Sequence, residues 1–286
     1  MPARYRPTLS NERLAPAHGV SVWDELGNLR QAQVAAERPL TLYVDKRELL
    51  TLMTLGSRPE LLTLGYLLNQ GLVKDPEEIV SVQVDWDVDA SVVVTRDGIA
   101  DWESRLARRT VTTGCGQGTV FGDMMAGLEN LRLPPVHVRQ STIYGLLRAL
   151  SEFNEVYKSA GAVHGCALSD DEQILIFVED VGRHNAVDTI AGHMWLEGID
   201  GADKIFYTTG RLTSEMVIKV TQMGIPVLLS RSGVTHMGLE LARKVGVTLI
   251  ARAKGQHFLV YNGIDRIELD SPPRRPDRVP AGTEEH

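Results

Sequence analysis

Apolar residues recur with both helical and strand periods along residues 38–96, which we interpret as a small α+β unit. Apolar positions three to four residues apart predict helices over residues 47–55 and 60–71. Short runs of apolar and β-branched residues predict strands over residues 39–44, 79–84 and 90–94. The residues before them, about the first 37, are mixed and polar, and are predicted to form an irregular arm or an early strand pair.

The pattern changes in the second half of the chain, where strands and helices alternate. Residues 97–135 are rich in glycine and predict little regular structure, whereas residues 138–158 predict one long amphipathic helix. Strands are then predicted at 163–168 and 174–178, as a pair, and at 204–207, 226–229 and 248–253, with helices at 186–196, 214–223 and 236–245. This alternation implies right-handed crossovers and favours a largely parallel sheet that is covered by helices.

These elements divide the chain into three predicted parts. Residues 1–135 form an N-terminal α+β unit that ends in a loop around Cys115, and residues 136–270 form a larger α/β domain. Residues 271–286 contain four prolines and many charges, a composition typical of a disordered tail. The predicted fold class is therefore α/β, with a smaller N-terminal α+β unit.

Composition narrows the classes of function. The formal net charge of −7 argues against a general nucleic-acid-binding protein, although local basic groups still allow a small anionic ligand. Two cysteines are too few for a secreted disulfide scaffold and favour a reducing compartment. The chain shows neither an apolar signal segment after its first residues nor a run near the roughly 20 apolar residues of a membrane helix. We therefore expect a cytoplasmic protein.

The two cysteines have different surroundings in the sequence. Cys115 lies between Gly114 and Gly116, so its sulfur could be exposed on a flexible loop, and nearby arginines could favour the reactive thiolate. The alternative is an inert, partly buried thiol, which is the common state of a free cysteine. Cys166 lies in an apolar predicted strand and is predicted to be a core residue.

Three predicted strand-to-helix junctions carry similar chemistry, at residues 179–186, 208–214 and 230–235. Each combines glycine and arginine with hydroxyl or amide side chains where a helix begins, and helix N-termini favour phosphate groups. In an open α/β sheet such junctions gather at the carboxyl ends of the strands. They predict a phosphate or nucleotide pocket, although serine, threonine and glycine are also ordinary capping and turn residues.

Asp180 and Asp188 flank the first junction, and the sequence leaves two roles open for them. They could cap the helix or pair with Arg183, or they could accept hydrogen bonds from a base or ribose. Metal binding is not predicted, because two cysteines and scattered histidines give a poor ligand set and the zinc-deaminase motifs H-x-E and P-C-x-x-C are missing.

Residues 179–188, E-D-V-G-R-H-N-A-V-D, resemble the signature block of the formate dehydrogenase accessory sulfurtransferases, the FdhD family. Residues 37–44, 63–68, 210–211 with 214–216, and 224–227 also resemble family segments, and the resemblance runs from about residue 20 to residue 262. It implies a cytidine-deaminase-like three-layer core, usually in a homodimer, without the deaminase zinc. It also implies a sulfurtransferase that takes persulfide sulfur from a cysteine desulfurase. The sulfur then passes to the molybdenum bis(molybdopterin guanine dinucleotide) cofactor of formate dehydrogenase, which a guanine nucleotide such as GDP would partly mimic.

The resemblance assigns roles to particular residues. The family motif T-G-C-G-x-C-G aligns with residues 113–119, so Cys115 takes the persulfide role, while the second motif cysteine is Gly118 here. A single persulfide carrier remains chemically sufficient. The implied cofactor-contacting stretch is 252–257, and the junctions add further candidates. The full set of cofactor-binding candidates is Arg252, Ala253, Lys254, Gly255, Gln256, His257, Arg183, His184, Gly210, Arg211 and Ser214.

Two other functions stay open from the sequence. Because half of the cysteine pair is missing, the protein could be a chaperone that binds the molybdenum cofactor for formate dehydrogenase without transferring sulfur. A zinc-dependent nucleotide deaminase is the third alternative, and it requires a bound metal.

Overall fold

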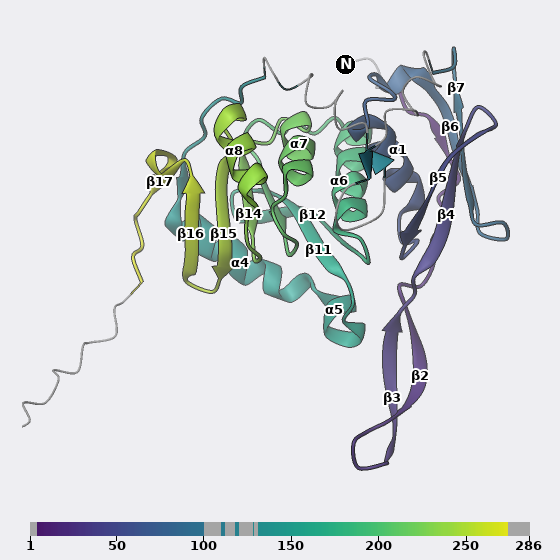
Figure 1. The fold of residues 1–286 in the computed structure, drawn as a ribbon, viewed down its shortest axis with the longest axis horizontal. Coiled ribbons are helices and arrows are strands. Elements are labelled where there is room, and N and C mark those ends of the chain that lie inside the picture. Colours follow the sequence, from purple (N-terminus) through teal and green to yellow (C-terminus); the bar gives the residue numbers. More distant parts are fainter. Residues whose placement is uncertain (1–4, 100–109, 112–117, 120–127, 129–130, 274–286) are drawn as a thin grey trace, which may run out of the picture.

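A computed structural model describes residues 5–99, 110–111, 118–119, 128 and 131–273 of the protein. Two large sheets, with helices between and around them, account for most of these residues (Figure 1). The predicted Cys115 loop and residues 274–286 of the predicted tail lie outside the described residues. Among the described helices, none combines the length and the apolar character needed to cross a bilayer.

The larger sheet has six strands in the order β12-β11-β13-β14-β15-β16. Their bounds are β11 His164–Asp170, β12 Gln173–Asp180, β13 Ile205–Thr208, β14 Val227–Ser230, β15 Thr248–Lys254 and β16 His257–Asn262. Only β13, β14 and β15 pair with one another in parallel, since β12 and β13 both pair antiparallel with β11 and β16 pairs antiparallel with β15. The prediction of a largely parallel sheet is therefore right only for the centre, while the strand pair predicted at residues 163–168 and 174–178 is confirmed as the β11–β12 hairpin. The antiparallel strand β16, which follows β15 through another tight turn, was not predicted.

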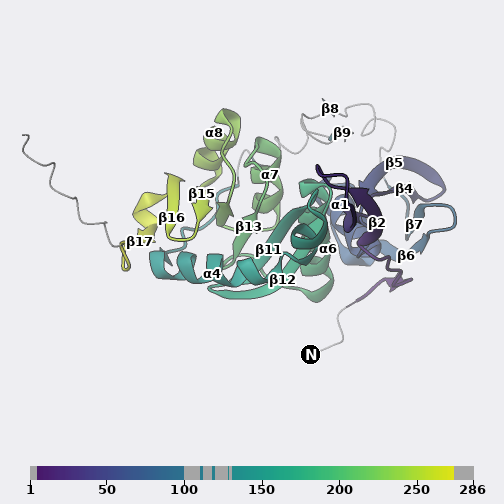
Figure 2. The ribbon, with the colours of Figure 1, turned by 90° about the horizontal axis from the view of Figure 1, so that it is seen from below.

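Helices cover both faces of this sheet (Figure 2). One face carries α6 Arg183–Glu197, α7 Ser214–Gln222 and α8 His236–Val245, which share a hydrophobic cluster with β11 to β15. The other face carries α4 Gln140–Phe153, and Ile143, Leu146 and Leu150 of this helix pack against Ala167 and Leu229. The α/β fold class with a three-layer core is thus confirmed.

The long helix predicted over residues 138–158 is interrupted. Its first two residues form β10 Val138–Arg139, which pairs with β17 Ile267–Glu268, and α4 then ends at Phe153. Asn154 leaves the helical region with ψ of 63° and its side chain donates to the carbonyl of Leu150 (2.8 Å). A short second helix, α5 Glu155–Ala160, follows. An asparagine side chain that satisfies a backbone carbonyl can end a helix without proline or glycine.

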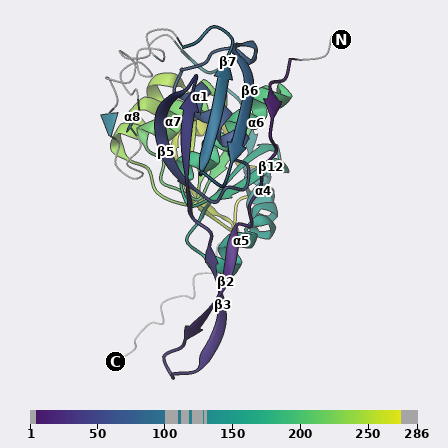
Figure 3. The same cartoon turned by 90° about the vertical axis from the view of Figure 1, so that its right-hand side faces the viewer.

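The N-terminal part is built on a five-stranded sheet in the order β1-β6-β7-β4-β5. Its elements are β1 Thr8–Leu9, β4 Arg38–Val44, β5 Arg47–Thr54, α1 Pro59–Asn69, the 3-10 turn η1 Pro76–Glu78, β6 Ile79–Asp85 and β7 Ala90–Thr95. A separate hairpin, β2 Ala17–Trp23 and β3 Leu29–Ala35, projects from the body (Figure 3). Of the two forms expected for the first residues, the strand pair is therefore the one observed.

The helix predicted at residues 47–55 is wrong, because β5 occupies this segment. β5 pairs antiparallel with β4 through a two-residue turn in which Asp45 and Lys46 both have positive φ (48° and 69°). That geometry suits a tight hairpin, although asparagine and glycine usually supply it. Along β5, Leu49 and Leu52 are buried and Met53 is exposed. Sheet packing thus overrides the helix-like spacing of the leucines.

The two parts of the molecule meet where α1 packs on α6, and glycine allows the close approach. A β-carbon on Gly65 of α1 would overlap the backbone of Asp188, and one on Gly192 of α6 would overlap the carbonyl of Leu61. Helix backbones in such contact leave no room for larger side chains. We call this contact the α1–α6 seam.

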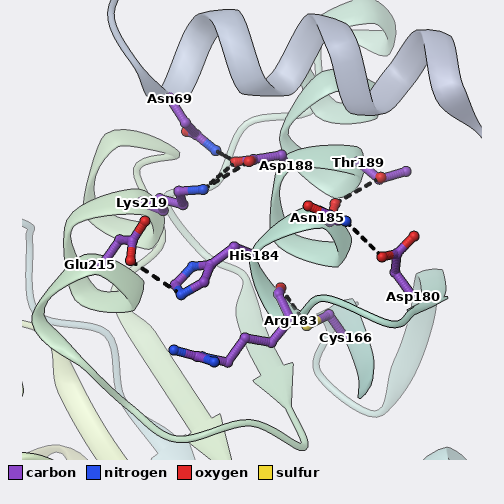
Figure 4. A network of polar contacts seen from close by, with 10 residues as sticks. All are labelled: Asn69, Cys166, Asp180, Arg183, His184, Asn185, Asp188, Thr189, Glu215 and Lys219. Carbon is purple, nitrogen blue, oxygen red and sulfur yellow. Dashed lines mark hydrogen bonds and ion pairs between the residues drawn. The ribbon is translucent and has the colours of Figure 1, made fainter. Parts of the chain in front are cut away.

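A buried polar network links α1, α6 and α7 beside the seam (Figure 4). Asp188 accepts two hydrogen bonds from Lys219 Nζ of α7 (2.8 Å each) and one from Asn69 Nδ2 of α1 (2.7 Å). Neither Asp188 nor Lys219 is exposed. Because a buried charge without its partner is strongly destabilising, this network fixes α1, α6 and α7 relative to one another.

The seam makes a testable prediction about stability. Glycine to alanine in a helix normally raises stability by about 1 kcal/mol. Gly65→Ala should instead lower the free energy of unfolding by about 1–3 kcal/mol or more, because the methyl group overlaps rigid backbone. Urea unfolding measures the change. Gly19→Ala is the control, since its β-carbon meets only Gln33 Nε2 at 3.5 Å. A Gly65→Ala protein as stable as the wild type would contradict the seam.

Candidate functional site

One edge of the six-stranded sheet gathers the three glycine- and arginine-containing junctions. β12, β13 and β14 end there at Asp180, Thr208 and Ser230. β11 begins at the same edge, with His164 opposite Asp180 and Cys166 opposite Thr208. The predicted clustering of these junctions is therefore observed, and we call this place the junction edge.

Hydrogen bonds join the second and third junctions into one rigid surface. Ser230 Oγ donates to the carbonyl of Gly210 (2.7 Å), and the amide of Leu212 donates to the carbonyl of Gly233 (2.9 Å). Thr213 and Thr235 cap α7 and α8 by accepting from backbone amides in the first turn. These threonines have the ordinary capping role. Only the arginines at these junctions therefore favour a phosphate ligand.

Arg183, the first residue of α6, is the unusual group at this edge. Its relative exposure is 5%, and its Nε and Nη2 have no hydrogen-bond partner in the described part of the chain. Its side chain lies on Gly210, where a β-carbon would come 2.6 Å from Arg183 Cδ. In Figure 4 no dashed line reaches its guanidinium. A buried cation for which the described residues supply no acceptor is costly to the fold.

His184 points away from the junction edge and into the protein. Its Nε2 lies 3.2 Å from Glu215 Oε2, and both side chains are almost fully buried. Burial, followed by the charges of Lys219 and Arg183, holds the pKa of His184 well below its usual range. The imidazole is therefore neutral, and its position favours a structural role over the contact with phosphate or base that the sequence suggested.

Asp180 and Asp188, which flank the first junction, both have partners within the protein. Asp180 Oδ1 accepts from the amide of Gly182 (2.9 Å) and from Asn185 Nδ2 (2.8 Å). Its Oδ2 accepts from Thr54 Oγ1 (2.6 Å) and the amide of Leu55 (3.1 Å). Asp188 pairs with Lys219. Asp180 therefore orders the turn before α6 without capping the helix, since the N-cap is Gly182 and no side chain caps it. The pairing partner of Asp188 is a lysine rather than Arg183.

A cavity of about 350 Å³ opens at the junction edge. It is lined by Asn154, Tyr157, Val163, His164, Gly165, Thr209, Arg231 and Ser232. Burial, with the nearby charges of Arg183 and Arg211, lowers the pKa of His164. Sequence reasoning did not single out Asn154, Tyr157 or His164 as binding residues. Asn154 and Tyr157 lie in the segment where α4 is interrupted, which the sequence did not predict.

Residues 252–257 lie at the same edge of the sheet, where β15 ends and turns into β16. Arg252 is exposed, has a positive φ of 55°, and its amide donates to the carbonyl of Ser232 (2.9 Å). A non-glycine residue in this region is strained, by about 1–3 kcal/mol, and such strain is common at binding sites. Ala253 is buried in the core, so its side chain does not face a ligand. The remaining four residues, Lys254, Gly255, Gln256 and His257, are exposed where β15 turns into β16.

The other candidates divide between the surface and the interior. Arg211 is exposed beside the junction edge, Ser214 is half-buried at the start of α7, and Gly210 is buried beneath Arg183. Cys115 lies outside the described residues. The arrangement thus brings Arg183, Gly210 and Arg211 together with the 230–233 and 252 backbone.

Cys166 is buried in the core, as predicted. Its Sγ lies 3.2 Å from Thr208 Oγ1, and it is fully enclosed. Burial raises the pKa of the Cys166 thiol to about 12. No group of three histidine, cysteine or acidic side chains in the described residues could hold a metal ion. The donor set of a zinc deaminase is therefore not found in this part of the chain.

Comparison with known proteins identifies a family. The sequence profile of the FdhD/NarQ family matches residues 35–268. A sulfur carrier protein FdhD from Listeria monocytogenes is 28% identical over 241 residues, covering 83% of this chain and 92% of that protein. The corresponding protein from Halalkalibacterium halodurans is 27% identical over 263 residues, covering 91% and 97%.

A solved structure agrees with this similarity. The crystal structure of a protein from Desulfotalea psychrophila, described as a formate dehydrogenase accessory protein, superposes with a TM-score of 0.70 at 29% identity. The match covers 88% of this chain and 98% of that one. Because the family profile spans most of the sequence and the fold agrees, the chain belongs to the FdhD/NarQ family.

Proposed function

We propose that this protein is a cytoplasmic sulfur carrier required for formate dehydrogenase activity. Cys115 accepts persulfide sulfur from a cysteine desulfurase and transfers it to the molybdenum bis(molybdopterin guanine dinucleotide) cofactor before insertion. The names of its relatives, sulfur carrier protein FdhD, support the sulfur role. The structural neighbour, named for formate dehydrogenase, supports the destination of the sulfur.

The single observation that carries the cofactor half of this proposal is the buried guanidinium of Arg183, whose Nε and Nη2 have no hydrogen-bond partner among the described residues. A buried arginine without an acceptor lowers stability unless a ligand supplies the anion. Arginine donors in a planar fork match phosphate oxygens. Arg211 and Arg231 are exposed at the same edge and add positive charge, so a diphosphate-containing nucleotide fits better than a neutral ligand.

The neighbouring loops would complete the nucleotide site. Gly210 lets the chain approach Arg183 closely, and the strained backbone at Arg252 brings residues 252–257 to the same edge. The exposed side chains of Lys254, Gln256 and His257 are the candidates for base or further phosphate contacts. His184, Ala253 and Ser214 then act from beneath or beside the ligand rather than as its principal contacts.

The sulfur step requires an accessible thiolate. In this step, the Cys115 thiolate attacks the terminal sulfur of the desulfurase persulfide. A new sulfur–sulfur bond forms on Cys115 while the desulfurase cysteine leaves as thiolate. Cys166 is unsuited to this chemistry because it is enclosed and its pKa is raised to about 12. We therefore propose a sulfurtransferase with one sulfur-carrying cysteine. We also propose that it acts as a homodimer, as the family resemblance implies.

The second candidate is a cofactor-binding chaperone without sulfur transfer. The specific observation in its favour is Gly118, which replaces the second cysteine of the family motif. Both candidates use the same junction edge for the cofactor, and they differ only in whether Cys115 is needed. Formate dehydrogenase activity that is supported equally well by a Cys115→Ala protein would favour the chaperone.

Arg183→Met tests the nucleotide site. The variant should weaken binding of GDP by about tenfold or more, since a charge-assisted hydrogen bond contributes roughly 1.5–3 kcal/mol. The free energy of unfolding without ligand should stay equal or rise, because an apolar side chain replaces an unpaired buried charge. Isothermal titration calorimetry and urea unfolding give the two values.

Arg148→Met is the matched control, because Arg148 is exposed on α4, which covers the opposite face of the sheet from α6. Guanosine, which has no phosphate, should bind the wild type and Arg183→Met with similar affinity. Unchanged GDP affinity in a folded Arg183→Met protein would count against the proposed site.

Thiol labelling tests the assignment of the sulfur-carrying cysteine. In native Cys115→Ala protein at pH 8, Cys166 should resist iodoacetamide, because burial both shields the thiol and raises its pKa to about 12. The same protein in urea should take up one label. Native Cys166→Ala, which keeps Cys115, should be labelled readily. Rapid labelling of Cys166 in the folded Cys115→Ala protein would contradict the buried, protonated thiol.

A further inference from the structure

A second cavity, of about 480 Å³, lies near the other end of α6 from Arg183. The N-terminal segment around β1, the start of α1 and the last turns of α6 form its walls. We call it the arginine pocket, after its ionisable lining, which consists of Arg6, Arg13, Arg58, Glu60, His193 and Glu197.

Both carboxylates of the arginine pocket already have partners. Glu197 Oε2 accepts from Arg6 Nη2 at 2.5 Å. Glu60 is buried, and its Oε1 accepts from Ser10 Oγ (2.6 Å) and from the amide of Glu12 (2.7 Å). These contacts hold the N-terminal segment against α1 and leave the acidic groups engaged at the walls.

The two remaining guanidinium groups have no such partner. Within the described residues, neither Arg13 nor Arg58 makes an ion pair or a side-chain hydrogen bond. Burial and the charge of Arg13 both lower the pKa of Arg58, so the two cations are close enough to repel each other. Burial and the charge of Arg58 likewise lower the pKa of His193. A bound anion would relieve this repulsion.

We propose that the arginine pocket binds a small oxyanion of the phosphate class between Arg13 and Arg58. Two arginines that approach from the N-terminal segment and from the start of α1 can each donate to different oxygens of one anion. α1 also begins at Pro59 without a side-chain cap, so the positive end of the helix adds to the field. The bound anion would tie the N-terminal segment to the α1–α6 seam.

The test is calorimetric titration with inorganic phosphate at constant ionic strength. Arg183→Met serves as the parent protein, so that the buried guanidinium proposed to bind phosphate at the junction edge is removed. Adding Arg13→Gln or Arg58→Gln should weaken phosphate binding by about tenfold each, through loss of a charge-assisted contact. Arg148→Gln removes the same charge from exposed α4 and should leave the affinity unchanged.

The phosphate titration tests the arginine pocket alone. GDP binding at Arg183 can succeed or fail without changing its result. A parent protein that does not bind phosphate would overturn the proposal, and so would equal phosphate affinity in the parent and a folded Arg13→Gln variant. Arg58 lies at the start of α1, so Arg58→Gln could disturb folding. In that case the Arg13→Gln variant alone gives the answer, because Arg13 is exposed and its replacement leaves the core unchanged.

Discussion

The close contact of α1 and α6 is the constraint on which the rest of the structure depends. Gly65 and Gly192 let the two helix backbones touch, and Asp188 joins both helices to Lys219 of α7 at the buried end. The five-stranded and six-stranded sheets are thereby held as neighbours across one helix pair (Figure 1). Since α6 begins at Arg183, the same contact also sets where this arginine is placed.

That placement links stability to function. With α6 fixed, the Arg183 side chain lies on Gly210, and the part of the chain that the structure describes offers its Nε and Nη2 no acceptor. The fold thus keeps a buried charge that lowers its own stability, together with a strained backbone at Arg252 on the same edge. Both costs are understandable if a phosphate-containing ligand completes the site. The buried, neutral His184 and the enclosed Cys166 support this edge from within and take no part in the proposed chemistry.

Much of the fold follows from the sequence, but the state of the key side chains does not. The alternating strands and helices from residue 163 onward are bounded by glycine, threonine and buried apolar runs, and they were predictable. β5 was not, because its leucines have helical spacing and the Asp45-Lys46 turn lacks the usual glycine. Nor could the sequence show that Arg183 is buried and lacks an acceptor among the described residues, since this depends on how α6 packs on the loop at Gly210. The junctions themselves were found because their arginines and glycines repeat.

The measurement that tests the central claim most directly is intact-protein mass spectrometry after incubation with an active cysteine desulfurase and cysteine. The account predicts that the wild type and Cys166→Ala gain the mass of one sulfur atom, whereas Cys115→Ala gains none. No added sulfur on the wild type, or added sulfur that persists on Cys115→Ala, would contradict the account. The first of these results would leave a cofactor-binding chaperone as the better description.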